Sequence, residues 1–351
     1  MRPGGSESMN ILLITTDQQR FDTLSCAGAP IGRTPNLDAL AARGVLFTRC
    51  YNQNPVCIPS RASLQTGRYP HQHGVTYMES VIHTTPGLPP WEWTFHERLR
   101  AAGYHTAAFG KIHMMPERGF DTLQVTGGKG QRWIYSTGQE IGPAPLGPQY
   151  AAWLEARQPG AYERIYEQRR RPEYRLYLSA LVHPLPASLH VETWIGDNTV
   201  AFLENPPAEP WFVWCGFTGP HGPLDVPPEY VDHYHPDQMP EPAHWSHDLR
   251  DRFPYRERLP RPLTREWSAR ARRFTAYYHG LMDLLDDQVG RILAVLEKRG
   301  LWENTLVLFT SDHGEMRGDL GLYGKGNFYE PVTRVPTIVV PPGGSRVGRR
   351  F

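Results

Sequence analysis

The stretch NILLITTDQ, residues 10–18, joins an apolar run to two polar residues, and this arrangement recurs along the chain. Residues 10–16 have the aliphatic and β-branched composition of a buried strand. Thr34 and Pro35 then predict the start of a helix, with threonine as the N-cap and proline in the first turn, and Gly44 predicts its end. A buried strand followed by a helix is the unit from which parallel sheets are built.

The same alternation continues to the other end of the chain. A capping-box pattern at 94–97 precedes LRAAG and predicts a second helix. A longer helix, with apolar residues at three- and four-residue steps, is predicted over 278–296 and ends at Gly300. Further strand-like runs are YHTAAFG (104–110), FVWCGF (212–217), TLVLFT (305–310) and TIVV (337–340). We therefore expect an α/β fold with a doubly wound, mostly parallel sheet and helices on both faces.

Length and charge narrow the class of protein. The 351 residues could form one large α/β domain or two smaller ones, and we favour one domain over 1–351. Lys and Arg total 37 against 36 acidic residues, so the net charge of +1 favours neither nucleic acid nor an anionic membrane as a partner. The first apolar run is too short for a signal sequence or a membrane span, and we expect a soluble, cytoplasmic protein. A homo-oligomer stays open.

Two local features interrupt the pattern. Residues 127–191 are rich in Trp, Tyr, Arg and Pro and are predicted to form an irregular insert over one edge of the sheet. Within it, residues 169–171 are three arginines, which we interpret as a solvated loop cluster rather than a polyanion site. The four cysteines form no CxxC pair, which argues against a disulfide framework or structural zinc. We expect Cys26, Cys50 and Cys215 to be small core residues.

Polar side chains follow four of the predicted strands. They are Asp17 and Gln18, Lys111 and His113, His221, and Asp312 and His313. Each one alone has an ordinary interpretation as a turn, loop or surface residue, and so does Lys325, which lies between two glycines. Ligands of open α/β sheets bind beyond the carboxyl ends of the strands. The recurrence there predicts a site for a divalent metal and a tetrahedral anion.

The stretch NPVCIPSRASLQTGR, residues 54–68, contains the pattern C-x-P-S-R-x-x-x-x-T-G-R, which begins at Cys57. Its six fixed positions beyond the cysteine would match by chance about once in 10⁷ cysteines. On these residues the chain resembles the type I sulfatase family of the alkaline phosphatase superfamily. The resemblance extends over almost the whole chain, including TPNLDALAARGVLFTRCY, GYHTAAFGKIH, PHGP and LVLFTSDHGEMRGDLGLYGKGNFYEPVTRVP.

The resemblance implies that a separate maturing enzyme oxidises Cys57 to formylglycine, whose hydrated aldehyde is the nucleophile toward a small-molecule sulfate ester. A geminal diol can attack through one oxygen and expel sulfate through the other, whereas a sulfated serine or cysteine would be hard to hydrolyse. Arg61 would stabilise the ionised hydrate, and Lys111 and Lys325 would hold the sulfate oxygens. His113 would assist the elimination. His221 would protonate the leaving alcohol, with Lys325 as the alternative donor.

The resemblance also implies one divalent metal ion, held by Asp17, Asp312, His313 and position 57. Gln18 is a further candidate ligand. Many sulfatases have a second aspartate in place of Gln18 and an asparagine in place of His313. Calcium prefers oxygen ligands and imidazole suits manganese, so Ca²⁺ and Mn²⁺ both stay open.

The sequence is compatible with three functions. The leading one is sulfate ester hydrolysis, favoured by Lys111 and His113. The alternative is a phosphonate monoester or phosphodiester hydrolase on the same scaffold, because Gln18 and His313 look like the choices of the phosphonate monoester hydrolase and choline-sulfatase-like branches. The third is an inactive, truncated homologue. Family members usually continue past 337–340 into a smaller C-terminal subdomain, which we expect to be absent or truncated here, in a naturally short member or a fragment.

Overall fold

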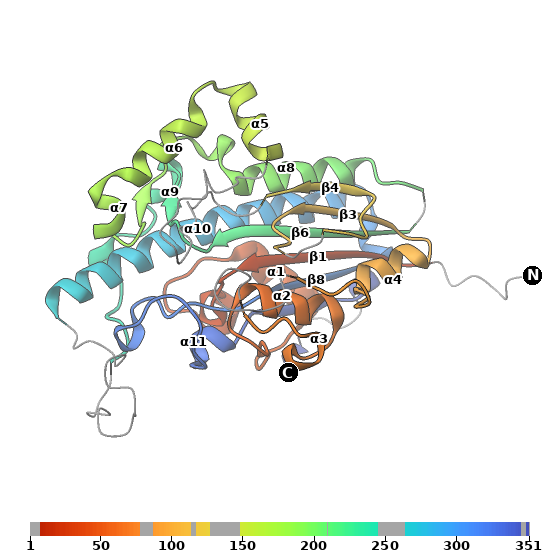
Figure 1. Cartoon of the computed structure of the whole chain (residues 1–351), viewed down its shortest axis with the longest axis horizontal. Coiled ribbons are helices and arrows are strands. Elements are labelled where there is room, and N and C mark those ends of the chain that lie inside the picture. Colours follow the sequence, from red (N-terminus) through yellow and green to blue (C-terminus); the bar gives the residue numbers. More distant parts are fainter. Residues whose placement is uncertain are drawn as a thin grey trace, which may run out of the picture.

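The computed structural model describes residues 8–77, 87–113, 117–126, 148–208, 210–244, 264–344 and 349–350. Within them, the main sheet has eight strands in the order β10-β2-β9-β8-β1-β6-β3-β4 (Figure 1). They are β1 (Asn10–Asp17), β2 (Val45–Leu46), β3 (His105–Gly110), β4 (Thr122–Val125), β6 (Trp211–Pro220), β8 (Thr305–Ser311), β9 (Thr337–Val340) and β10 (Arg349–Arg350). The five adjacent strands β8, β1, β6, β3 and β4 run parallel, and β9 is antiparallel to its neighbours β8 and β2. The predicted mostly parallel sheet is confirmed.

Helices cover both faces of this sheet. The helices are α1 (Pro35–Arg43), α2 (Cys57–Thr66), α3 (Pro70–His73), α4 (Phe95–Ala101), α5 (Pro148–Arg157), α6 (Ala161–Arg170), α7 (Pro172–Leu176), α8 (Val191–Glu204), α9 (Pro228–Val231), α10 (Arg265–Lys298) and α11 (Glu330–Thr333). Figure 1 shows α8 and α10 along one face, with α2 and α4 on the other. None of the described helices is long and apolar enough to span a membrane.

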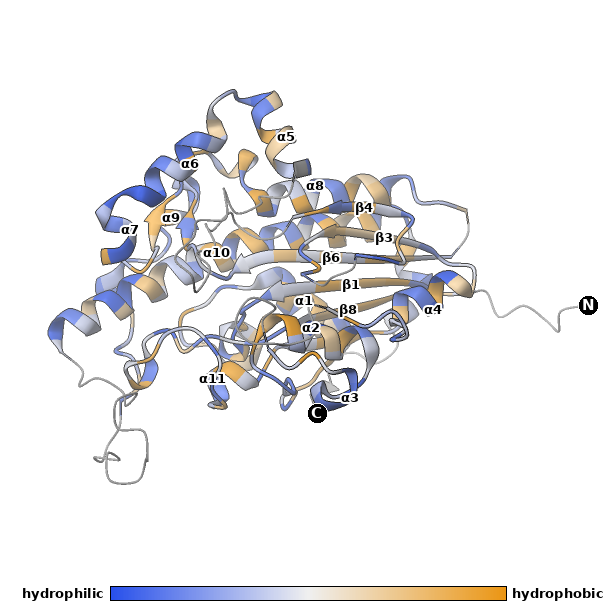
Figure 2. Ribbon diagram, viewed as in Figure 1, coloured by the Kyte–Doolittle hydropathy of each residue, from blue (hydrophilic) through white to orange (hydrophobic). Residues whose placement is uncertain are grey.

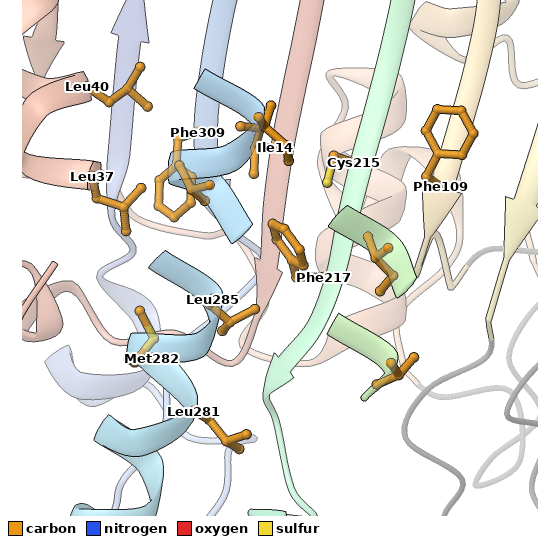
Figure 3. Packing of buried hydrophobic residues seen from close by; sticks show 14 of the residues in the cluster. Ile14, Leu37, Leu40, Phe109, Cys215, Phe217, Leu281, Met282, Leu285 and Phe309 are labelled. Carbon is orange, nitrogen blue, oxygen red and sulfur yellow. The ribbon is translucent and has the colours of Figure 1, made fainter. Parts of the chain in front are cut away.

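The core forms two layers because strand side chains alternate between the faces of a sheet. On β1, Leu12 and Ile14 join the larger buried cluster, whereas Leu13 joins the smaller one on the opposite face. The larger cluster packs the sheet against α1, α8 and α10, and Figure 3 shows Ile14 and other strand residues opposite Leu285 of α10. The smaller cluster packs it against Ile58 and Ala62 of α2. Burial on both faces explains why these strands read as continuous apolar runs.

The predicted helix boundaries are largely reproduced. Helix α1 begins after Thr34 and ends at Gly44. Thr94 and Glu97 form the predicted capping box at the start of α4. Helix α10 extends further toward the N-terminus than predicted, to Arg265, where the Thr264 hydroxyl accepts a hydrogen bond from the amide of Trp267.

The insert differs from its predicted irregular form. Residues 148–176 make three helices, α5 to α7, and β5 (Leu181–Val182) pairs with β7 (Asp225–Val226). Residues 127–147 of the insert lie outside the described residues. The side chain of Gln149 hydrogen-bonds the backbone of Val125 and Leu123, so α5 packs on edge strand β4. Figure 2 shows that α6 and α7 are largely hydrophilic, which explains why their apolar periodicity was too weak to predict helices.

Two smaller expectations were wrong. Arg169 is at the end of α6, where its guanidinium makes a buried ion pair with Asp225 at 2.7 Å, so the arginine run is not simply a solvated loop cluster. Cys26 and Cys50 are partly exposed, whereas Cys215 is fully buried as expected. Cys26 lies in a single 3-10 turn, Ser25–Ala27, and Cys50 lies in the connection between β2 and α2, and neither segment is long enough to have a periodic pattern from which burial could be predicted.

Candidate active site

The carboxyl ends of four parallel strands deliver most of the predicted site residues. Asp17 is the last residue of β1, Asp312 and His313 follow β8, Lys111 and His113 follow β3, and His221 follows β6. Strands β3, β6, β1 and β8 are consecutive neighbours in the sheet, so their ends meet at one edge. The fifth contribution comes from α2, which begins at Cys57 on the opposite face of the sheet from α10.

The sulfur of Cys57 is the point on which the site converges. It lies 2.6 Å from Lys325 Nζ, 3.1 Å from His313 Nε2 and 4.0 Å from Asp17 Oδ1. Burial and the Asp17 carboxylate oppose ionisation of the thiol, but Lys325, His313 and a hydrogen bond from His113 hold the pKa of Cys57 well below its ordinary value. The surroundings of position 57 therefore favour a negatively charged side chain.

Four residues could hold a metal ion. The donor atoms of Asp17, Cys57, Asp312 and His313 all lie within 4.8 Å of one another, and all four side chains are buried. His313 Nδ1 faces the carbonyl oxygen of Gly314 at 2.9 Å, which leaves Nε2 directed at the cluster. Two carboxylates and an imidazole nitrogen are a donor set that suits a divalent cation, so the residues fit the metal that the motif implies.

Arg61 ties this cluster together from the next turn of α2. Its Nε donates to Asp312 Oδ2 at 2.8 Å and a terminal nitrogen donates to Asp17 Oδ2 at 3.1 Å. Another terminal nitrogen donates to the carbonyl oxygens of Lys111 and Ile112. Arg61 is fully buried, and it donates hydrogen bonds to the two carboxylates and to two backbone carbonyl oxygens. It therefore orients Asp17 and Asp312.

The two lysines occupy different positions. Lys111 Nζ lies 2.5 Å from Asp17 Oδ2. Although burial of the Asp17 carboxyl acts in the opposite direction, Lys111, His221 and Arg61 hold its pKa well below the ordinary value. Lys325 instead bridges the sulfur of Cys57 and Gln18 Oε1, the latter at 3.0 Å. One cation thus faces the carboxylates and the other faces the nucleophile position.

His113 and His221 both reach position 57. A hydrogen bond to Cys57 contributes to the pKa of each imidazole. Burial dominates in both cases and holds each pKa below its ordinary value, helped by Lys111 at His113 and by Lys325 at His221. His221 Nδ1 lies 2.6 Å from the carbonyl oxygen of Gly222. Both residues are therefore neutral imidazoles near neutral pH, able to exchange protons with groups at position 57.

Three contributing residues were not predicted. Glu315 is 1% exposed, and its carboxylate accepts a hydrogen bond from Gln18 Nε2. The Tyr278 hydroxyl donates to the carbonyl oxygen of Gln18 at 2.5 Å, and Ser60 Oγ donates to the carbonyl oxygen of Asp312 at 2.6 Å. Glu315 follows the SDHG stretch directly, and that position was the one available signal. Tyr278 was counted only as part of the apolar stripe of α10.

A parallel α/β sheet with carboxylates, imidazoles and lysines gathered at its carboxyl edge around a buried cysteine that begins a helix defines a class: hydrolases of the alkaline phosphatase fold. The structure is similar to that of the phosphonate monoester hydrolase of Agrobacterium radiobacter, with a TM-score of 0.78 and 26% sequence identity, over 98% of this chain and 70% of that chain. The Sulfatase family model matches residues 9–350, and the chain belongs to the sulfatase family.

Two relatives illustrate the family. The chain is 32% identical over 357 residues to an arylsulfatase of Clostridium perfringens, which covers 97% of this chain and 70% of that protein. It is 30% identical over 358 residues to a choline-sulfatase of Rhizobium meliloti, which covers 95% of this chain and 63% of that protein. Both relatives are named as sulfuric ester hydrolases, and this chain spans about two thirds of their lengths.

Proposed function

We propose that this chain hydrolyses sulfate esters with a nucleophile built from the side chain of Cys57. The observation that carries the proposal is the environment of that side chain at the start of α2. One ammonium and one imidazole lie within 3.1 Å of its sulfur, beside a buried cluster of metal-type donors. Family membership supports the same reaction class.

The nucleophile is formylglycine, made from Cys57 by a separate maturing enzyme with its own oxidant. The motif around Cys57 supports this, because proline and arginine stand at the spacing that the sulfatase resemblance requires. A hydrated aldehyde supplies one oxygen for attack on sulfur and a second hydroxyl through which sulfate leaves. The sulfur atom of Cys57 marks where those oxygens stand, so its neighbours are the groups that act on them.

Asp17, Asp312, His313 and position 57 would hold one divalent ion, with Gln18 as a further oxygen ligand. Such an ion supplies positive charge that polarises a sulfate oxygen and favours the ionised form of the nucleophile. The imidazole of His313 favours Mn²⁺, whereas the carboxylate and amide oxygens suit Ca²⁺, so both ions are candidates. Arg61 keeps Asp17 and Asp312 in place through its two ion pairs.

The remaining residues divide the handling of charge and protons. Lys111 and Lys325 hold the sulfate oxygens, where negative charge increases in the transition state. Burial acts against protonation of Lys325, but Cys57, Asp17 and Asp312 raise its pKa, so it keeps its proton at neutral pH. The lowered pKa of His221 leaves that imidazole mostly without a proton near neutral pH in the substrate-free site, so protonated Lys325 is the better donor to the leaving alcohol. His113, with its lowered pKa, suits the base that assists release of sulfate.

The alternative function is hydrolysis of phosphonate monoesters or phosphodiesters. It is favoured by Gln18 and His313 at the metal site, and by similarity to a solved phosphonate monoester hydrolase at 26% identity. These substrates also present a single negative charge on a tetrahedral centre. The same cations therefore suit them better than a doubly charged phosphate monoester.

A panel of four esters with the same aryl leaving group tests the choice. Matured, metal-loaded protein should give the highest kcat/KM for the aryl sulfate, a lower value for the phosphonate monoester and phosphodiester, and the lowest value for the phosphate monoester. A constant leaving group removes its contribution to the ranking. If the phosphonate monoester or the phosphodiester gives a higher kcat/KM than the aryl sulfate, the alternative function replaces the leading one.

A further inference from the structure

Glu315 is a buried carboxylate that accepts hydrogen bonds from three donors. One oxygen, Oε1, accepts from the backbone amide of Arg317 at 3.0 Å and from the amide of Gly324. The other oxygen, Oε2, accepts from Gln18 Nε2. An ionised carboxylate can only accept, so this arrangement uses both oxygens of Glu315 and fixes which end of the Gln18 amide faces it.

The other end of the Gln18 amide faces the catalytic cluster. Gln18 Oε1 accepts from Lys325 Nζ at 3.0 Å, and the same ammonium lies 2.6 Å from the sulfur of Cys57. Lys325 can only donate and Glu315 can only accept, so a reversed amide would place two donors together at one end and two acceptors at the other. The two opposing partners therefore hold the oxygen toward Cys57.

The backbone of Gln18 is also held in a conformation that side chains rarely adopt. Its φ of 69° lies in the left-handed region, which is strained for a non-glycine residue. Asp312 Oδ1 accepts from its amide at 3.0 Å, and the Tyr278 hydroxyl donates to its carbonyl oxygen at 2.5 Å. Because these contacts fix the main chain of Gln18, Glu315 acts on the orientation of its side-chain amide.

We propose that Glu315 is a positioning residue that turns the oxygen of Gln18 toward Cys57 and the metal-binding cluster. This inference rests on the proposed function, since it makes that oxygen available as a ligand of the divalent ion. A carboxylate at position 18 would face the carboxylate of Glu315, so Glu315 also accounts for an amide at the position where many sulfatases have an aspartate. Residues 18 and 315 thus act as a pair.

The test is a swap of the two side chains, read by Mn²⁺ binding to the full chain. In Glu315→Gln, the amide nitrogen of residue 315 must face either the backbone amides that Glu315 accepts from or the Nε2 of Gln18, and both arrangements bring donors together. Gln18 is then no longer held in one orientation, so we expect Mn²⁺ affinity to fall roughly 10- to 100-fold. Gln18→Glu should also change the Mn²⁺ affinity, because the new carboxylate at position 18 then faces the carboxylate of Glu315. The double variant Gln18→Glu, Glu315→Gln again pairs one carboxylate with one amide, with residue 315 now donating to residue 18. It should recover most of the Mn²⁺ affinity. Free Mn²⁺ is measured by electron paramagnetic resonance.

Asp286→Asn is the matched control. This buried carboxylate accepts hydrogen bonds from the amides of Asn36 and Leu37 at the start of α1 and does not contact the cluster. It should lower the thermal unfolding midpoint without changing Mn²⁺ affinity. A double variant that binds Mn²⁺ no better than Glu315→Gln alone would overturn the pairing.

The wild type and the three variants of residues 18 and 315 are also unfolded thermally without metal, where rescue of the midpoint by the double variant supports the pair and additive losses contradict it. This second reading separates the inference from the proposed function. A wild-type chain that binds no Mn²⁺ or Ca²⁺ would contradict the metal site, while the metal-free cycle would still decide whether Glu315 orients Gln18.

Discussion

At the scale of single residues, Cys57 differs from the other buried cysteine, Cys215, in its charged neighbours. Cys215 is enclosed in the core, where burial raises the pKa of its thiol to about 12. Cys57 is equally buried, but Lys325 and His313 reverse the effect of burial and lower its pKa. The difference lies in the charged neighbours rather than in exposure, so it could be inferred from the motif but not from burial.

Replacement of Cys57 should separate chemistry from folding. We expect Cys57→Ala to reduce kcat on an aryl sulfate by roughly 10³-fold or more, since no other group stands at the nucleophile position. The thermal midpoint should change little because the smaller side chain relieves burial of a polar group. Cys50→Ala is the control, because Cys50 is partly exposed and lies outside the donor cluster. Full activity in Cys57→Ala would place the nucleophile elsewhere.

At the scale of elements, α2 is fastened to the strand ends by Arg61. This guanidinium joins the helix to Asp17 at the end of β1, to Asp312 after β8 and to the backbone after β3. The helix that carries Cys57 is therefore held by the same carboxylates that would hold the metal. Position 57 and the metal site should be lost together when this link is removed.

Arg61→Met tests this link. Removing the guanidinium leaves the buried Asp312 without this ion-pair partner and Asp17 with Lys111, which should lower the free energy of unfolding by about 3–5 kcal/mol and abolish metal binding. Urea unfolding and metal analysis measure the two effects. Arg170→Met is the control, because the ion pair of Arg170 with Glu163 is about half exposed and should contribute about 0–1 kcal/mol. Equal stabilities of the two variants would contradict the anchoring role of Arg61.

The elements also show where prediction from sequence succeeds. Strands β1, β3, β6 and β8 were predicted because burial on both faces gives them continuous apolar runs, and the residues at their ends followed from the sheet geometry. Helices α5 to α7 were missed because they pack partly on one another and on an edge strand, with little apolar periodicity. Glu315 and Tyr278 were missed for another reason. Their roles are hydrogen bonds to Gln18 across the fold, and no spacing in the sequence encodes such a contact.

At the scale of the whole molecule, the buried histidines predict sensitivity to mild acid. Burial lowers the pKa of His96 from 6.5 to about 4, because the imidazole packs flat against Phe120 in the interior. In the unfolded chain the imidazole has its ordinary pKa, so between pH 6.5 and 4 the unfolded state binds more protons than the folded state. Stability is therefore complete above pH 6.5 and decreases as the pH falls toward 4.

The expected contribution of His96 between pH 7 and pH 5 is about 2 kcal/mol of unfolding free energy. Urea unfolding of the metal-free protein at both pH values measures it. His96→Gln should show a smaller loss between pH 7 and 5 than the wild type, although its stability at pH 7 is lower. His279, whose pKa is lowered to about 3 by burial and Arg317, contributes in the same direction in both proteins and cancels in the comparison. Identical losses would assign the acid sensitivity to other groups.

The central claim is that sulfate ester hydrolysis depends on formylglycine at position 57. The most direct test uses protein made with and without a formylglycine-generating enzyme, loaded with the same metal. Digestion after Arg49 and Arg61 releases the peptide CYNQNPVCIPSR, and mass spectrometry measures the fraction in which Cys57 is converted. We predict that kcat per mole of protein on an aryl sulfate rises in proportion to that fraction and is negligible when only thiol is present. Full sulfatase activity in protein whose Cys57 is entirely thiol would contradict the account.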